Sequence, residues 1–395
     1  MGLRPWWRDG VMLPRARRSA AAGGLLATLG LVLSACSSGT PAASSSSTTS
    51  TLPPLPPDVS AWVTLIGAGA NLGNGDTVLP IDLTEGASGK AAPVRVGAFP
   101  SAIAIAPDGK TAYVANYASD TVTPIDLATD KVGAPIRAGS GPAGIAIAPD
   151  GKTAYVTDAG TNPIGHAVTP INLATDKVGA PIPVGDGPEG IAVTPDGATV
   201  YVADTGAVIT GQSGVIGSTV TPFSAATGKA GTPIKVGNAP ESLAVSPDGS
   251  VVYVANANSE SITPIDVATG AAAGSIAMPG PPQSIAFAKN GTTAWVTVAL
   301  SALPKGGELV PIDTATGRAG TPIPLCKSPA GLAITPNGAT AWVACTGSGE
   351  LVPVNLATRS VGAPISIPGG PYALAVTLSP RRAPGRAAPA HHHRG

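Results

Sequence analysis

The stretch IAIAPDGKTAYVAN, from Ile103 to Asn116, decides the fold because the chain repeats it with small changes six times. In each copy an apolar run short enough for a buried strand leads to a turn, in which Gly supplies an unusual φ and, in five of the six copies, Pro fixes φ. A second apolar run follows. The repeated unit is therefore a β-hairpin, and its later copies begin at Ile145, Ile191, Leu243, Ile285 and Leu332.

Each hairpin is followed by two further strand signals. After the first hairpin, DTVTPIDLATDKVGAPI from Asp120 supplies a third strand, a polar turn and a fourth strand. Four short antiparallel strands in about forty to fifty residues, repeated in tandem, are typical of propeller blades. The full copies begin at Pro100, Pro142, Pro188, Pro240, Pro282 and Pro329.

The two ends of the repeat region supply a seventh blade. PYALAVT from Pro371 matches a first strand, and AWVT from Ala61 matches a second strand. DTVLPIDL from Asp76 and APVRVG from Ala92 match the third and fourth strands. The sequence therefore predicts an all-β protein, a seven-bladed β-propeller of four-stranded antiparallel blades, whose ring is closed by a blade split between the N- and C-terminal segments.

One proline recurs in the third strand of every predicted blade. A central strand should donate hydrogen bonds to both neighbours, and proline has no N–H to donate. We therefore expect a bulge or a gap in the strand ladder at Pro80, Pro124, Pro170, Pro222, Pro264, Pro311 and Pro353.

The second strands AYVAN, AYVTD, VYVAD and VYVAN carry a family resemblance. They resemble the YVTN β-propeller repeat, a bacterial extracytoplasmic family with a lactonase-like propeller fold. The resemblance covers residues 61–377. It implies the fold and an extracytoplasmic location, and it implies no single activity because one fold hosts many functions.

The ends of the chain predict export. Basic residues up to Arg18 and an apolar run from Ala20 form a signal peptide, residues 1–35, too short for a comfortable membrane span. The run ends in LSAC, which resembles the lipobox of bacterial lipoproteins and implies acylation of Cys36. An ordinary signal peptide with an incidental cysteine is the alternative, Met12 is an alternative start, and Arg17-Arg18 is a poor match to a twin-arginine signal.

The remaining segments complete the domain organisation. Residues 36–57 are rich in Ser, Thr and Pro and are predicted to be a solvated tether. Residues 58–380 are the propeller, and residues 381–395 form a tail with too little to bury for folding. The predicted location is the extracytoplasmic face of the cell membrane, through the lipid anchor.

The charge of the folded part argues against nucleic acid as a partner. The whole chain has 23 bases and 23 acids, but nine of the bases and one acid lie in the leader and the tail. Residues 36–380 therefore hold 14 bases and 22 acids, a net charge of −8. A phosphate backbone would be repelled by such a domain.

A candidate site lies where the first strands meet the central channel. The face that holds the links between blades, here called the top face, also holds the loops between second and third strands. The residue after each blade-opening proline should line the channel mouth there. These residues are Ser101, Ala143, Glu189, Glu241, Gln283, Ala330 and Tyr372.

The two glutamates stand on neighbouring blades, and Asp158, Asp186 and Asp204 lie nearby in the same register. Such carboxylates could bind a divalent cation or a polyhydroxylated ligand, or one could act as a base. The alternative is a set of solvated acids at loop positions.

The top face also carries loops of uneven length, which are a usual place for function on a regular scaffold. The long ones lie in residues 66–78, 157–168, 203–220 and 297–310, and tolerated insertion is the alternative. His166 stands alone there, and the sequence has neither a histidine cluster nor a G-x-S-x-G motif. We therefore expect no catalytic residue and no cofactor, with a divalent cation left open.

Two cysteines are expected to pair. By register, Cys326 replaces Gly185 in a link between blades, and Cys345 replaces Asn116 at the end of a second strand. Both positions fall on the top face at one blade junction. We predict a disulfide, which the oxidising environment of an exported protein would favour.

Three functions fit these observations. The first is a non-catalytic, lipid-anchored envelope propeller that binds an envelope protein or glycan through its top-face loops. The second, by analogy with lactonase-like propellers, is a hydrolase of sugar lactones that uses Glu189 or Glu241 with a bound metal. The third is a structural envelope component without a small ligand.

Overall fold

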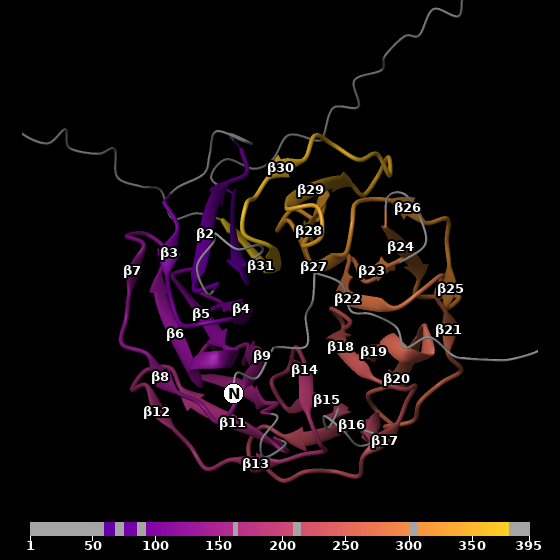
Figure 1. Cartoon of the computed structure of the whole chain (residues 1–395). Coiled ribbons are helices and arrows are strands. Elements are labelled where there is room, and N and C mark those ends of the chain that lie inside the picture. The colour runs from indigo at the N-terminus through magenta and orange to yellow at the C-terminus, as the bar shows by residue number, and fades with distance from the viewer. Residues whose placement is uncertain are drawn as a thin grey trace, which may run out of the picture.

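The computed structural model describes residues 59–67, 75–84, 92–160, 165–207, 215–300 and 306–378 (Figure 1). The predicted signal peptide, Cys36, the tether and the C-terminal tail lie outside these residues. In the described part of the chain, no helix has the length and apolar character needed to cross a membrane.

The described residues form seven antiparallel sheets around a common axis, which confirms the predicted seven-bladed propeller (Figure 1). Blade 1 contains β31 (Pro371–Leu378), β1 (Val59–Leu65), β2 (Thr77–Asp82) and β3 (Val94–Arg95). Blade 2 contains β4 (Pro100–Ile105), β5 (Thr111–Asn116), β6 (Thr121–Asp126), β7 (Lys131–Val132) and β8 (Ile136–Arg137), with a 3-10 turn η2 (Tyr117–Ser119). Blade 3 contains β9 (Pro142–Ile147), β10 (Thr153–Asp158), β11 (Ala167–Asn172), β12 (Lys177–Val178) and β13 (Ile182–Pro183).

The remaining blades repeat this order. Blade 4 contains β14 (Pro188–Val193), β15 (Thr199–Ala207), β16 (Val215–Ser224) and β17 (Ile234–Lys235). Blade 5 contains β18 (Pro240–Val245), β19 (Val251–Asn256), the 3-10 turn η3 (Ala257–Ser259), β20 (Ser261–Asp266) and β21 (Ile276–Ala277). Blade 6 contains β22 (Pro282–Phe287), β23 (Thr293–Ala299), β24 (Gly307–Asp313), β25 (Arg318–Ala319) and β26 (Ile323–Pro324). Blade 7 contains β27 (Pro329–Ile334), β28 (Thr340–Cys345), β29 (Glu350–Asn355) and β30 (Ile365–Ser366).

The ring closes through the split blade, as the sequence predicts. Strand β1 pairs with β2 on one side and with β31 on the other. Val59 lies opposite Leu378, so both ends of the described propeller emerge at the face that holds the first hairpin turns, here called the bottom face. The closure removes the free inner edge that a linear array of sheets would expose.

The third-strand proline faces a gap in the outer ladder. Pro124 pairs with Tyr113 on the inner side. On the outer side the fourth strand is divided into β7 and β8, and only the Pro124 carbonyl is used, accepting a hydrogen bond from the Gly133 N–H at 2.9 Å. The predicted ladder gap is therefore present. The same carbonyl contact, at 2.7 to 2.8 Å, recurs at Pro170, Pro222, Pro264, Pro311 and Pro353.

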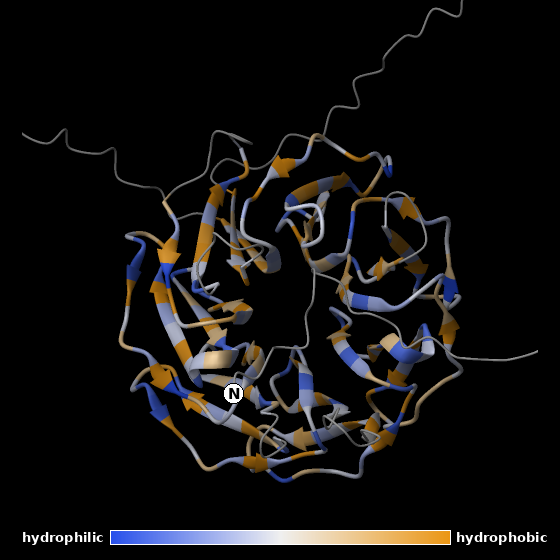
Figure 2. Cartoon of the chain, viewed as in Figure 1, coloured by the Kyte–Doolittle hydropathy of each residue, from blue (hydrophilic) through white to orange (hydrophobic). Residues whose placement is uncertain are grey.

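The core lies between neighbouring blades. Tyr113 and Ala115 of blade 2, for example, pack with Ile145 and Val156 of blade 3. Apolar residues follow the strands while polar residues gather in the turns (Figure 2). The second strands are mostly buried, whereas most positions of the inner strands keep partial exposure, for example in β4. The inner strands therefore border a solvent-accessible space along the ring axis, here called the central channel.

Candidate functional site

A β-bulge at the top of each inner strand creates the channel mouth. In blade 5, Pro240 lies opposite Asn256 and Ser242 lies opposite Ala255, which leaves Glu241 as the extra residue. Gln283 is the extra residue of blade 6 in the same way, and Glu189 and Tyr372 fall within the shifted segments of blades 4 and 1. Bulges bend a strand and re-aim side chains. From the sequence we expected a bulge or a ladder gap only in the third strand. The recurring Pro-X at the start of each inner strand was the signal that could have indicated the inner-strand bulge.

Glu189, Glu241 and Tyr372 occupy opposite sides of the channel mouth. Glu189 and Glu241 lie on adjacent blades 4 and 5. Tyr372 lies on blade 1, three blades away from each of them in the two directions around the ring. The charges of both glutamates act on the Tyr372 hydroxyl. The structure therefore places one phenol across the channel from a pair of carboxyl groups.

Burial changes the protonation of all three groups. Surrounding protein raises the pKa of Glu189 to about 7. Burial and then the charge of Glu189 raise the pKa of Glu241 well above its usual value. Burial and then the two carboxylates raise the pKa of Tyr372. Near neutral pH the glutamate pair therefore retains a proton, and the tyrosine is a hydrogen-bond donor.

No described residue neutralises the glutamate pair. The ion pairs among the described residues are Arg95–Asp76 and Lys152–Asp150, and neither involves a channel residue. Within the same residues, no group of three or more His, Cys, Asp or Glu side chains is arranged to hold a metal ion. The raised pKa values of the two glutamates therefore have no ion pair among the described residues to lower them. Gln283 on blade 6 adds an amide, whose Nε2 donates a long 3.4 Å hydrogen bond to the Pro282 carbonyl.

Asp158 and Asp204 belong to a different group of contacts, here called the blade latch. In it, a polar side chain on the second strand is hydrogen-bonded to a threonine on the third strand of the same blade. Asp158 is the last residue of β10, Asp204 has the equivalent position in the longer strand β15, and each side chain contacts the third strand of its own blade. Asp204 accepts hydrogen bonds from the Thr219 and Thr221 hydroxyls at 2.8 Å and from the Gly185 N–H at 3.0 Å. Asn116 makes the equivalent contacts in blade 2, to the Gly97 N–H and to Thr123. The structure therefore does not bring these two aspartates into the channel-mouth group.

The latch of blade 3 is incompletely satisfied. The Thr169 hydroxyl donates to Asp158 Oδ2 at 2.8 Å, but Asp158 Oδ1 is buried without a hydrogen-bond partner. Burial raises the pKa of Asp158 to about 6, with a smaller contribution from the charge of Asp120. Burial also raises the pKa of Asp204, and the charge of Asp186 in the adjoining link adds to the increase. Asp186 itself is exposed, in the link that leads into blade 4.

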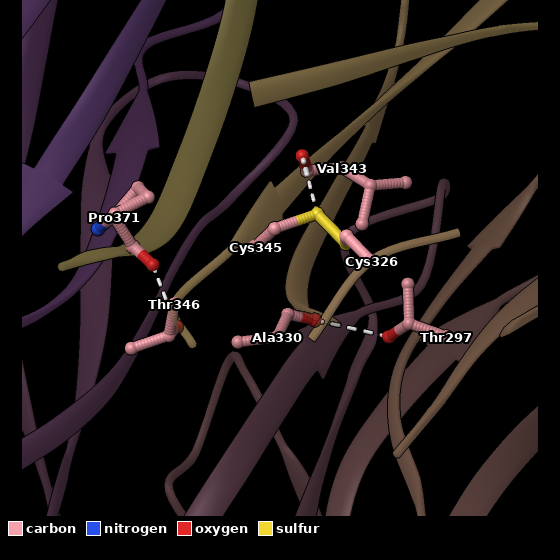
Figure 3. The surroundings of a disulfide bond; sticks show 7 residues. All are labelled: Thr297, Cys326, Ala330, Val343, Cys345, Thr346 and Pro371. Carbon is pink, nitrogen blue, oxygen red and sulfur yellow. Dashed lines mark hydrogen bonds between the residues drawn. A yellow bond between two sulfur atoms is a disulfide. The ribbon is translucent and has the colours of Figure 1, made fainter. Parts of the chain in front are cut away.

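Cys326 and Cys345 form a disulfide at the latch position of blade 7, with Cα atoms 6.0 Å apart (Figure 3). Both cysteines are buried. The next residue, Thr346, donates its hydroxyl hydrogen bond to the Pro371 carbonyl at 2.6 Å, as Figure 3 shows. The disulfide therefore fixes a segment that contacts the residue directly before Tyr372.

Parts of the predicted long top-face loops, residues 68–74, 161–164, 208–214 and 301–305, lie outside the described residues. His166 is described, and its side chain is exposed.

Comparisons with known proteins support the fold. No protein-family model and no curated protein matches the sequence. Among solved structures, Kuenenia stuttgartiensis hydrazine synthase is 22% identical with a TM-score of 0.61, covering 69% of this chain and 88% of that chain. A functionally unknown protein from Desulfotomaculum acetoxidans is 16% identical with a TM-score of 0.63, covering 81% and 98%. A candidate 6-phosphogluconolactonase from Bacteroides fragilis is 17% identical with a TM-score of 0.62, covering 84% and 99%. At these identities the similarity shows a shared β-propeller fold.

Proposed function

We propose that this chain is a non-catalytic, lipid-anchored propeller of the cell envelope that binds its ligand or partner through the top face, with the channel mouth as the anchor of the site. The observation that carries the proposal is the convergence of Glu189, Glu241 and Tyr372 at the channel mouth with raised pKa values. Partly buried titratable groups with shifted pKa values that border one space are typical of binding sites.

The position of the chain ends supports the proposed orientation. Val59 follows the predicted tether, and it pairs with Leu378 at the bottom face. A lipid on Cys36 would therefore hold the bottom face toward the membrane. The top face would point away from it, toward an envelope protein or glycan.

The charge of the top face defines the chemistry of the ligand. Its described residues include ten acids and four bases. The acids are Asp76, Asp120, Asp158, Asp186, Glu189, Asp204, Glu241, Glu260, Glu308 and Glu350, and the bases are Arg95, Arg137, Lys235 and Lys327. A face with this excess of acids favours a neutral hydrogen-bonding ligand or a cationic one, and it disfavours a polyanion.

A lactonase-like hydrolase is the second candidate. Burial raises the pKa of Glu189 to about 7, which is the range of an effective general base at neutral pH. Candidate 6-phosphogluconolactonases are among the proteins of similar fold. The described inner strands contain no Lys or Arg to bind a phosphate group. This candidate therefore applies to uncharged sugar lactones.

A thermal-shift panel separates these proposals. The full chain is heated with calcium, magnesium, gluconolactone, a quinone cofactor and cell-wall oligosaccharides, one at a time. A ligand at one hundred times its dissociation constant should stabilise the fold by about 2.7 kcal/mol. The double variant Glu189→Gln, Glu241→Gln should lose the shift, whereas Glu260→Gln, an exposed top-face acid, is the matched control.

Each outcome has a defined meaning. A shift that survives in the double variant removes the channel mouth from the proposal. A shift with gluconolactone, together with release of gluconate that the double variant abolishes, replaces the binding proposal with the hydrolase. A shift with an oligosaccharide, without product, supports the binding function.

A further inference from the structure

The position two residues after the blade-opening proline is a glycine in three of the seven blades. That position is Gly144 in blade 3, Gly190 in blade 4 and Gly331 in blade 7. The blades that follow these three around the ring, blades 4, 5 and 1, carry Glu189, Glu241 and Tyr372. Each glycine therefore directly precedes, in ring order, one member of the site.

The three glycines contact the backbone of those residues. A Cβ atom on Gly144 would overlap the carbonyl oxygen of Glu189. A Cβ on Gly190 would lie 2.8 Å from the Glu241 carbonyl oxygen, and a Cβ on Gly331 would lie 2.5 Å from that of Tyr372. Real Cβ atoms do not approach a carbonyl oxygen so closely, so a side chain at any of the three positions would displace the next inner strand.

Hydrogen bonds hold the strands in this close arrangement. The Thr157 hydroxyl accepts from the Gly144 N–H at 2.7 Å and donates to the Glu189 carbonyl at 2.9 Å, so one side chain joins the glycine to the site residue. Thr205 donates to the Pro240 carbonyl directly before Glu241, and Thr346 donates to the Pro371 carbonyl directly before Tyr372.

The other four blades show that the fold itself does not require glycine here. The equivalent positions are Ala102, Ser242, Ser284 and Ala373. They precede, in ring order, the channel-mouth residues Ala143, Gln283, Ala330 and Ser101. A Cβ is therefore compatible with a blade junction of this ring, and glycine occurs at the three junctions that lead to the two carboxyl groups and the phenol.

We propose that Gly144, Gly190 and Gly331 are positioning residues of the channel-mouth site, which let the following inner strand approach closely and so fix where Glu189, Glu241 and Tyr372 enter the channel. The inference rests on the proposed function only for the statement that these three side chains bind a ligand. Their placement by the glycines is tested without any ligand.

The test measures the glutamate carboxyl groups directly. The full chain contains six glutamates, Glu85, Glu189, Glu241, Glu260, Glu308 and Glu350, so labelling with δ-13C glutamate gives six carboxyl signals that titrate separately by NMR. Glutamate-to-glutamine variants assign the signals. Thermal unfolding of each variant is recorded in parallel.

We expect Gly144→Ala to lower the titration midpoint of Glu189, and Gly190→Ala that of Glu241, each by about half a pH unit or more, because displacement returns the carboxyl group to solvent. The signals of Glu260, Glu308 and Glu350 should not move. Ala102→Gly, which changes the same position at a junction leading to Ala143, is the matched control and should leave all six midpoints unchanged.

Folded Gly144→Ala and Gly190→Ala proteins with the parental midpoints for Glu189 and Glu241 would overturn the proposal. If Gly144→Ala unfolds, Gly190→Ala decides, because its added Cβ is less crowded. A ligand panel without any hit leaves this result untouched, so failure of the proposed function and failure of the glycine inference are distinguishable.

Discussion

In the turn that follows the third strand, Asp126, Asp266 and Asp313 each accept hydrogen bonds from a threonine three residues later. These bonds to the threonine side chain and backbone lower the pKa of each aspartate. On the opposite face of the same ring, burial raises the pKa of Asp158 and Glu189. The repeat therefore satisfies its bottom-face acids within one turn, while it places top-face acids where their ionised form is poorly stabilised.

The comparison separates architecture from function. The bottom-face turns recur in nearly every blade because each one is a self-contained hydrogen-bonded unit, which any blade can reuse. The top-face acids differ from blade to blade, and no ion pair among the described residues stabilises the ionised carboxyl groups of Glu189 and Glu241. This difference supports the proposal that the bottom face serves the scaffold and the channel mouth serves binding.

We expect the largest change in stability when the Cys326–Cys345 disulfide of blade 7 is removed. Cys326→Ser with Cys345→Ser should lower the free energy of unfolding by about 3 kcal/mol, the loop-entropy value for a bridge across about twenty residues. Urea unfolding at pH 7 measures the loss. Cys326→Gly with Cys345→Asn should recover part of it, because it recreates the Gly97–Asn116 latch of blade 2.

Peptide mass mapping provides the control for this prediction. Alkylation of the denatured, non-reduced chain should leave Cys326 and Cys345 unlabelled. Labelled thiols at both positions, or a serine variant as stable as the parent, would show that blade 7 has no covalent latch.

The channel pair should give the next largest effect. Because the pKa of Glu189 is raised from 4.5 to about 7, the folded state holds protons that the unfolded state releases, so stability decreases as pH rises through this window. We expect Glu189→Gln with Glu241→Gln to be more stable than the parent at pH 8 by about 2 kcal/mol, after allowance for partial solvent contact. Parallel pH–stability curves for the two proteins would contradict the raised pKa values.

Removing the charge of Asp158, the latch residue of blade 3, should also stabilise the fold, but by a smaller amount. The pKa of Asp158 is raised from 3.8 to about 6, so the ionised carboxylate destabilises the fold. This destabilisation is absent below pH 3.8 and complete above pH 6. Asp158→Asn, which copies Asn116, should stabilise the fold at pH 7 by about 1 kcal/mol in urea unfolding. Asp204→Asn is the matched control and should gain less, because both oxygens of Asp204 already accept hydrogen bonds.

Removing a bottom-face aspartate should change the free energy of unfolding least, and it should destabilise the fold rather than stabilise it. The pKa of Asp266 is lowered, first by the Thr269 hydroxyl, so its contribution to stability is present above pH 3.8 and is lost as pH falls through the folded pKa. Asp266→Ala should be slightly less stable than the parent at pH 7 and equal to it in strong acid. If Asp266→Ala were more stable than the parent at pH 7 in urea unfolding, the bottom-face aspartate would not be stabilised in its ionised form, which would contradict the difference between the two faces.

The sequence was sufficient for the architecture because the repeat states it several times. The PDG turns, the second strands and the split halves at Ala61 and Pro371 each occur in the order that the closed ring requires. The disulfide followed from register alone, since Cys326 and Cys345 replace two residues that contact each other in other blades. Repetition thus converts weak local signals into a defined topology.

The site was only partly predictable. Register placed Glu189, Glu241 and Tyr372 at the channel mouth. It gave the same height to Asp158 and Asp204, whose side chains turn into the blade because they lie on second strands rather than inner strands. The inner-strand bulge was missed although the recurring Pro-X could have signalled it, whereas the glycine contacts were missed because they depend on the packing of one blade against the next. The repeat pattern of a single blade carries no information on that distance.

The carboxyl carbon spectrum of the six glutamates tests most directly whether ligand binding occurs at the channel mouth, as we propose. The spectrum is recorded with each panel compound that raises the unfolding temperature. We predict that such a compound shifts the signals of Glu189 and Glu241 and leaves those of Glu260, Glu308 and Glu350 in place. A compound that stabilises the fold while the Glu189 and Glu241 signals stay unmoved would contradict the account.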